Sequence, residues 1–357
     1  MKVTNQLPHF TRYFLAFLAG VWFFGQGVSL VAAATPQLNR ISPTRVNAGT
    51  DNVTVTLAGN SFAADNEVFI NDLPVAAQMS GGAITVTVPN SLTAQPGILY
   101  FVVKSVDGFA SDPRALLVLD PASINPQNAA ITNSASYSLA TAPGSMATIF
   151  GTHLATGSEL AAGLPLPIQL TGTSVFINGS AVPLIYAGGD VNTGASQVNF
   201  IMPEDVAAGT TEVLVFAGNG VVTLGTVEVS DAVPGVFTMN QSGRGLPIAL
   251  TTADGVNFAS VANLDGTPRT ISAGTPDQPT YLILFGTGWH RRTDLGNVSV
   301  SIGGVAASVA YAGSQPDFFG LDQMNVIIPS ILAGLGQAEI IINVDGREAN
   351  RTVITIQ

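Results

Sequence analysis

The sequence predicts an all-β protein of three tandem β-sandwiches that follow an N-terminal export signal. The stretch 175–220 alternates short apolar strands with two Asn-Gly turns, and the same order of strands and turns recurs at 68–108 and 300–346. Hydrophobic residues make up 46% of the chain, whereas charged residues make up 10%, so material for packed cores is plentiful. A length of 357 residues suits two or three domains of about 100–150 residues each. The three copies favour three domains.

Residues 1–34 have the pattern of a signal peptide. Lys2 and Arg12 supply positive charge, 13–24 is an apolar run, and small residues at 31–34 suit a signal peptidase. We expect cleavage after Ala33 or Ala34. An uncleaved anchor is the alternative, because 13–34 is about long enough to cross a bilayer. Both alternatives place the rest of the chain outside the cytoplasm, and signal removal leaves no membrane span.

Charge and cysteine content exclude several functions. Removing 1–34 takes away Lys2 and Arg12 but no acidic residue, so the net charge of −11 becomes −13. An acidic surface argues against nucleic acid and against anionic lipid, since both require basic residues. There are no cysteines, which excludes disulfides, thiolate metal sites and cysteine nucleophiles.

The first domain is predicted at 35–120. In the strand 53–57, Val and Leu alternate with Thr, as expected for a strand with one buried face. Ile-Ser-Pro at 41–43, Gly-x-x-Phe ending at Phe62, a strand ending at Pro89 and a hairpin with Asp107-Gly108 follow in order. This order resembles the IPT/TIG domain, and the resemblance implies an immunoglobulin-like β-sandwich over about 36–120.

The second domain is predicted at 121–231. Short motifs of this domain and the next lie at 133–137, 142–145, 149–154, 175–179, 197–203, 234–237, 311–313 and 320–326. These motifs resemble an uncharacterised C-terminal domain family of exported soil-bacterial proteins, and the similarity covers about 129–357. The family has no assigned chemistry, so the resemblance implies membership but no catalytic residue. Asp322 departs from the family pattern, because the family more often has tyrosine or a similar residue there.

The third domain is predicted at 232–357, with an irregular inserted segment at 234–280 that we interpret as a flap between the second and third sandwiches. From Tyr281 the repeated order of strands returns. Alignment of the copies pairs a strand-ending glycine with a large residue three positions later. Glycine is expected to supply backbone freedom at the strand exit, and the large residue to cover the core. The pairs are Gly59 with Phe62, Gly151 with Leu154 and Gly286 with Trp289.

Catalytic and metal-binding patterns are weak. His153 and His290 are the histidines after the signal, and no Gly-x-Ser-x-Gly elbow accompanies them. We therefore interpret both as loop residues and expect no enzyme and no cofactor. Zinc is not expected, because no two histidines have ligand spacing. The densest carboxylate and amide oxygens are candidates for a weak calcium site, with a polar turn as the favoured alternative: Asp65, Asn66, Glu67, Asn71 and Asp72, with Asp120 and Asp231 near domain junctions.

One loop differs from the repeats and is the candidate ligand-binding site. Trp289, His290, Arg291 and Arg292 follow one another, and Trp289 is the only tryptophan after the signal. Loops held by a rigid sandwich often carry recognition, and Trp and Arg are favoured anchors. The alternative, which we favour, places Trp289 in the core, as its aligned partners Phe62 and Leu154 suggest.

These observations predict an exported binding or structural protein that acts at or beyond the cell surface. Its expected partner is a carbohydrate, another surface protein or a second copy of itself. An alternative is an accessory module that positions a polysaccharide-active or proteolytic enzyme. The sequence itself names no ligand.

Overall fold

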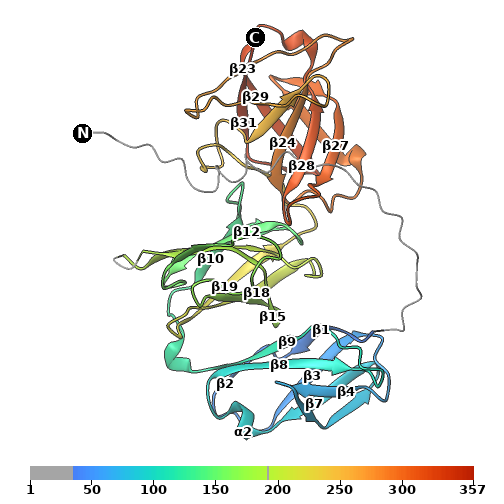
Figure 1. Ribbon diagram of the computed structural model, residues 1–357, viewed down its shortest axis with the longest axis vertical. Helices are drawn as coiled ribbons and strands as arrows, with labels where there is room; N and C mark the ends of the chain where they lie inside the picture. The colour runs from blue at the N-terminus through green and yellow to red at the C-terminus, as the bar shows by residue number, and fades with distance from the viewer. Residues whose placement is uncertain (1–34, 191–192) are drawn as a thin grey trace. The chain divides into compact units, whose positions relative to one another are not determined.

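The computed structural model describes residues 35–190 and 193–357 (Figure 1). The predicted signal peptide at 1–34 lies outside these residues. Strands make up almost all of the regular secondary structure of the described chain, with one four-residue α-helix and three short 3-10 helices. The predicted all-β sandwich fold is therefore confirmed. Thr35–Gln357 forms one compact unit.

The first sandwich has a four-stranded and a five-stranded sheet, ordered β1-β3-β7-β6 and β2-β9-β8-β4-β5. The predicted alternation holds in β3, where Val53, Val55 and Leu57 are buried and the threonines between them are exposed. The buried side chains of both sheets form one core. The elements are β1 (Gln37–Ser42), β2 (Arg45–Asn47), β3 (Val53–Asn60), β4 (Glu67–Ile70), β5 (Leu73–Val75), β6 (Ala77–Ser80), β7 (Ala83–Val88), α2 (Asn90–Thr93), β8 (Gly97–Lys104), β9 (Arg114–Leu119) and the 3-10 helix η1 (Pro121–Ser123).

The second sandwich is one 10-stranded sheet that encloses its own core. Its strands follow the order β13-β16-β17-β12-β10-β19-β18-β14-β15, and β11 pairs with β19. A short parallel pairing of β10 with β19 joins the two halves. The strands are β10 (Ala129–Asn133), β11 (Ala140–Thr141), β12 (Met146–Thr152), β13 (Ser158–Leu160), β14 (Ser174–Ile177), β15 (Ser180–Ala181), β16 (Leu184–Gly189), β17 (Ala195–Ile201), β18 (Gly209–Phe216) and β19 (Val222–Val229).

The third sandwich has two six-stranded sheets around one core. One has the order β22-β21-β24-β28-β27 with β20 paired to β24, and the other β23-β31-β29-β25-β26 with β30 paired to β29. The elements are β20 (Gly235–Val236), β21 (Ala249–Thr252), β22 (Ala259–Ser260), β23 (Thr270–Ile271), β24 (Tyr281–Thr287), η2 (Leu295–Asn297), β25 (Val298–Ile302), β26 (Val305–Ala307), β27 (Val309–Ser314), β28 (Asp322–Ile327), η3 (Ser330–Leu332), β29 (Gly336–Val344), β30 (Arg347–Glu348) and β31 (Thr352–Ile356).

The irregular segment 234–280 belongs to the third sandwich. Its strand β21 pairs with β24 in one sheet, and β23 pairs with β31 in the other. The segment therefore builds edges of both sheets instead of forming a flap between sandwiches. Its strands β20, β22 and β23 have only two residues each, which explains why no alternating pattern identified them.

The aligned glycines are packed closely against the large residues that follow them, as the repeat alignment suggests. A Cβ atom on Gly286 would lie 2.2 Å from Cη2 of Trp289, and one on Gly59 would lie 2.6 Å from Cζ of Phe62. None of the three aligned glycines has a positive φ. The expectation of special backbone freedom is therefore wrong for these positions. Glycine is needed because a side chain would occupy the space of the covering residue.

Two of the turns do require the left-handed conformation. Asn178 and Gly179 have φ of 51° and 77°, and Asp345 and Gly346 have φ of 49° and 79°. Each pair closes a two-residue hairpin, β14 with β15 and β29 with β30. Positive φ at both central residues matches the type I′ turn, for which Asn-Gly and Asp-Gly are preferred.

Candidate functional site

The loop predicted to bind a ligand begins directly after β24. Trp289 is 0% exposed and belongs to the core of the third sandwich. Its backbone N–H donates a 2.7 Å hydrogen bond to Oδ2 of Asp322, and its indole N–H donates to the carbonyl of Gln323. The indole thus occupies the core position that alignment with Phe62 and Leu154 suggests.

His290 lies between two carboxylates. Its Nδ1 atom is 2.9 Å from Oδ1 of Asp322, and its backbone N–H donates to Oδ2 of the same residue. Its Nε2 atom is 3.6 Å from Oε1 of Glu204 in the second sandwich. Burial lowers the pKa of His290, but the hydrogen bond and charge of Asp322 and the charge of Glu204 outweigh burial and raise it. The imidazolium therefore strengthens the contact with both carboxylates.

Within residues 35–190 and 193–357, Asp322 and His290 resemble the carboxylate and histidine of an acid–base system, but no hydroxyl is hydrogen-bonded to Nε2 of His290. A catalytic triad consists of a carboxylate, a histidine that the carboxylate orients, and a hydroxyl at the other ring nitrogen of that histidine. In the part of the chain that the structure describes, Nε2 of His290 has no hydrogen-bond partner and faces the carboxylate of Glu204. The geometry fits an electrostatic contact that holds the second and third sandwiches together.

The two arginines of the loop point to different neighbours. Nη1 of Arg291 donates to the backbone carbonyl of Glu204, so this side chain also joins the second and third sandwiches. Arg292 lies beside β27. A Cβ atom on Gly313 would be 2.9 Å from Oη of Tyr311 and 3.5 Å from Nη1 of Arg292. Arg292 therefore shares one surface with the ring of Tyr311.

Three of the residues noted as candidates for a calcium site, Asn66, Asn71 and Asp120, have local structural partners. Oδ1 of Asn66 accepts from the Ala63 N–H, and Oδ1 of Asn71 accepts from the Tyr100 N–H. Asp120 accepts from the Ala122 N–H at the start of η1. Exposed His153 packs its ring against Gly194. Across residues 35–190 and 193–357, no three His, Asp or Glu side chains are grouped so that they could hold a metal ion.

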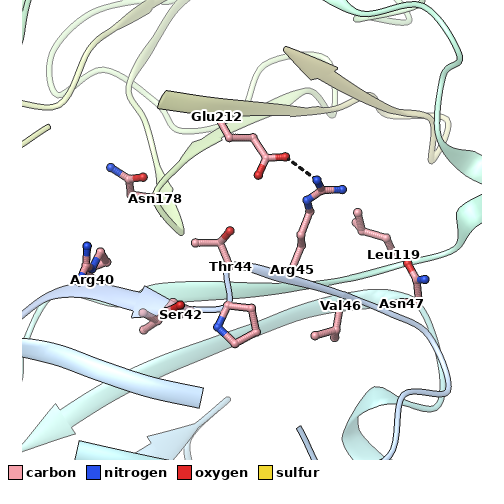
Figure 2. A pocket seen from close by; sticks show the side chains of 11 residues that line it. Arg40, Ser42, Thr44, Arg45, Val46, Asn47, Leu119, Asn178 and Glu212 are labelled. Carbon is pink, nitrogen blue, oxygen red and sulfur yellow. Dashed lines mark ion pairs between the residues drawn. The ribbon is translucent and has the colours of Figure 1, made fainter. Parts of the chain in front are cut away.

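A groove of about 710 Å³ lies between the first and second sandwiches (Figure 2). Residues 40–47 line it from the first sandwich, with Asn178 and Glu212 from the second. Figure 2 shows Arg45 extended toward Glu212, and their ion pair measures 3.0 Å. An apolar contact also holds these sandwiches together, made by Ala115, Leu117, Leu119, Phe176, Leu214 and Val222.

The outer surfaces of the second and third sandwiches each carry a hydrogen-bonded Gln–Asn pair with a tyrosine beside it. We call these surfaces the outer amide faces, formed by Tyr186, Gln197 and Asn199 in the second sandwich and by Tyr311, Gln323 and Asn325 in the third. In β17, the buried side chains of Val198 and Phe200 alternate with partly exposed Gln197 and Asn199. Nε2 of Gln197 donates a 2.7 Å hydrogen bond to Oδ1 of Asn199. Since successive side chains of a strand point to opposite faces, this amide pair lies on the surface away from the core.

Strand β28 repeats the amide pair in the third sandwich. Gln323 and Asn325 alternate with the buried Met324 and Val326, and Nε2 of Gln323 donates a 2.8 Å hydrogen bond to Oδ1 of Asn325. The two outer amide faces thus agree in residue type, spacing and hydrogen bond.

A tyrosine lies beside each amide pair. Tyr186 pairs with Asn199 across the β16–β17 ladder, and Tyr311 pairs with Asn325 across the β27–β28 ladder. Each tyrosine follows a register shift and is followed two residues later by glycine. A Cβ atom on Gly188 would lie 1.9 Å from Oη of Tyr186, so the phenol ring covers that glycine. Each tyrosine ring fills the space that a side chain would take at the following glycine, so the ring lies along the sheet next to the amides.

These residues were not predicted as a site, because 197–203, 311–313 and 320–326 were identified only as segments that match the exported soil-bacterial family. The alternation could have identified the amides as outward-facing residues, because every second residue of 197–200 and 323–326 is an amide. The first sandwich has Ala83 and Thr85 at the positions aligned with Gln197 and Asn199, yet β7 forms the corresponding strand. The amide pair is therefore not a requirement of this fold.

The fold and these surfaces define a class: an all-β protein of immunoglobulin-like sandwiches. No family model matches the chain, and no curated protein matches it. Among solved structures it is similar to SGBP-B of the Bacteroides ovatus mixed-linkage glucan utilization locus in complex with a mixed-linkage heptasaccharide, at 14% identity and a TM-score of 0.28, covering 94% of this chain and 71% of that chain.

Two further similar structures contain immunoglobulin domains. Titin Ig tandem domains are 12% identical, with a TM-score of 0.18 and coverage of 55% of this chain and 96% of that chain. Dpr2 Ig1-Ig2 in complex with DIP-Theta Ig1-Ig3 is 7% identical, with a TM-score of 0.20 and coverage of 90% and 99%. Identities and TM-scores are low for all three structures, so these comparisons assign neither a family nor a ligand.

Proposed function

We propose that the protein is an exported, non-catalytic binding protein that acts at the cell surface or in the extracellular space. The observation that carries this proposal is the repeated outer amide face. The same tyrosine, glycine, glutamine and asparagine occur on the surface of two sandwiches, and the first sandwich forms the equivalent strand without the amides. Polar groups that the core does not need are available for a partner.

The sequence resemblances support a more specific assignment within this proposal. The first sandwich would belong to the IPT/TIG domains, and residues 129–357 to the exported soil-bacterial family. The predicted signal peptide supports export. In addition, no helix within 35–190 and 193–357 is long and apolar enough to cross a membrane.

The contacts of His290 support a binding role over catalysis. Asp322 and Glu204 occupy the surroundings of both ring nitrogens, so the imidazole acts between sandwiches. In the loop of Trp289, His290, Arg291 and Arg292, we assign ligand contact to Arg292, which lies beside Tyr311. The other three would position the loop through the core and through Glu204.

The experiment is a binding assay with mature protein, residues 35–357, on cell-envelope and extracellular polymer fractions of the producing cells. We expect saturable, reversible retention on one fraction and no turnover of chromogenic esters, peptides or glycosides. His290→Gln should retain binding. Turnover that His290→Gln abolishes would show that the protein is an enzyme, and absence of retention on every fraction would contradict the binding function.

A further inference from the structure

The outer amide faces offer a chemistry that matches one class of ligand. We propose that each face, formed by Tyr186, Gln197 and Asn199 in the second sandwich and by Tyr311, Gln323 and Asn325 in the third, binds a segment of a neutral polysaccharide. This inference rests on the proposed binding function and assigns its ligand class and residues.

The tyrosine rings supply a surface for the apolar side of a sugar. The ring of Tyr186 covers Gly188, and Tyr311 is 39% exposed with its hydroxyl donating 2.6 Å to the Ser314 carbonyl. That bond fixes the phenol of Tyr311 along the sheet. The negatively polarised face of an aromatic ring attracts the weakly positive C–H groups that line one side of a pyranose. A ring held along the sheet leaves one face for such packing.

The amide pairs supply matched donors and acceptors. The Gln197–Asn199 hydrogen bond uses one N–H group and one oxygen, which leaves Oε1 of Gln197 and Nδ2 of Asn199 for a ligand. If both amides were rotated, one donor and one acceptor would still remain. Gln323 and Asn325 offer the same set. A vicinal diol, which can donate through one hydroxyl and accept through the other, complements this set.

Charge favours a neutral chain. The side chains on the outer surface of β12, β16 and β17 around the amide pair are uncharged, including Thr148, Phe150 and Tyr186. Residues 35–357 carry a net charge of −13, since loss of 1–34 removes Lys2 and Arg12 from the −11 of the full chain, and this charge repels polyanions at long range. In the third sandwich, Arg292 beside Tyr311 adds guanidinium donors, which bind neutral hydroxyl groups as well.

Two faces on one chain favour long ligands. A polymer that occupies one face raises the local concentration of its other segments at the second face, so a long chain binds more tightly than an oligosaccharide. The immunoglobulin-like frame holds both faces on rigid strands, which reduces the entropy lost on binding.

The test measures binding of mature residues 35–357 to a panel of soluble neutral polysaccharides: mixed-linkage β-glucan, galactomannan, arabinoxylan and amylopectin. Affinity electrophoresis and titration calorimetry compare wild type with Tyr186→Ala, Tyr311→Ala and the double variant. Phe258→Ala is the matched control, because Phe258 is 53% exposed and lies outside both faces. We expect binding to at least one polysaccharide, weakened about tenfold or more by each single variant and abolished in the double variant.

Gly188→Ala provides an independent variant, because the new Cβ atom would displace the Tyr186 ring without removing it. It should weaken binding like Tyr186→Ala while the unfolding midpoint stays near that of wild type. Absence of binding to the whole panel would overturn the proposal, as would equal binding by the double variant or an equal loss in Phe258→Ala. If envelope fractions still retain the protein in those cases, the binding function stands and only the polysaccharide assignment fails.

Discussion

The imidazole of His290 and the carboxylate of Asp322 form a part-buried pair in the third sandwich, with Nδ1 2.9 Å from Oδ1. Asp322 is 0% exposed and also accepts the backbone N–H groups of Trp289 and His290. One carboxylate therefore orients the whole turn after β24. Glu204 and Arg291 are the other charged groups at this contact.

The pair predicts that stability falls as pH rises. The pKa of His290 is raised above its ordinary value of about 6.5. A group with a raised pKa in the folded state stabilises fully below its unfolded pKa, and this contribution is lost as pH rises through the folded pKa. The stabilisation is therefore complete below about pH 6.5, and Tm should fall as pH rises above that value through the raised pKa. Calorimetry at stepped pH measures this.

Two variants isolate the source of that pH dependence. His290→Gln should remove the fall in Tm with rising pH. Glu204→Gln should make that fall smaller, because the charge of Glu204 helps to raise the pKa of His290. His153→Gln is the control, since exposed His153 forms no ion pair with any carboxylate in the described ranges 35–190 and 193–357, whereas His290 does. An unchanged slope in His290→Gln would refute this explanation.

Trp289→Ala should destabilise the protein by about 3–5 kcal/mol, because the indole is fully buried and its removal leaves a cavity. Trp289 is the only tryptophan in residues 35–357, so urea unfolding of the variant is followed by circular dichroism. Phe258→Ala should change stability by no more than about 0.5 kcal/mol, because that ring is exposed. A loss below about 1 kcal/mol in Trp289→Ala would contradict the core assignment.

Gly286→Ala should cost about 3 kcal/mol or more, because its Cβ atom would lie 2.1 Å from the Gly235 carbonyl oxygen and 2.2 Å from the Trp289 ring. Backbone and a buried ring cannot move aside cheaply. Gly97→Ala is the matched control, because no atom lies within 4 Å of its Cβ position. Chemical denaturation of the two variants should separate them, and equal midpoints would show that close packing is not the reason for glycine at 286.

Mass spectrometry of the exported protein should find Ala34 or Thr35 at the N-terminus, because small residues at 31–34 favour cleavage. Replacing Ala33 and Ala34 with Leu should slow processing, since each precedes one of the two expected cleavage sites and bulky side chains do not fit where small ones are required. A protein that keeps Lys2 in the membrane fraction would support the anchor alternative.

Local patterns in the sequence were sufficient for strands and turns. Alternation identified β3, and Asn178-Gly179 identified a hairpin, because neighbouring residues alone set side-chain alternation and turn conformation. The strands of segment 234–280 could not be predicted from local patterns, because β21 and β23 are defined by pairing with the distant strands β24 and β31.

Side-chain contacts between distant segments could not be predicted. Arg45 and Glu212 meet only because the first two sandwiches pack together, and His290 meets Glu204 only because the third packs against the second. Alignment with Phe62 and Leu154 placed Trp289 in the core. The different neighbours of His290, Arg291 and Arg292 are contacts that only the folded chain contains.

Hydrophobic alternation and turn residues act over a few positions, so they were sufficient to predict an all-β chain with three repeats. Which repeated residues serve the core and which face outward became clear only from the folded arrangement of the sheets. Gly286 recurs because Trp289 packs on it, whereas Gln197 and Gln323 recur on outer surfaces that the core does not need. Burial depends on contacts between strands far apart in the chain, and a local pattern does not contain those contacts.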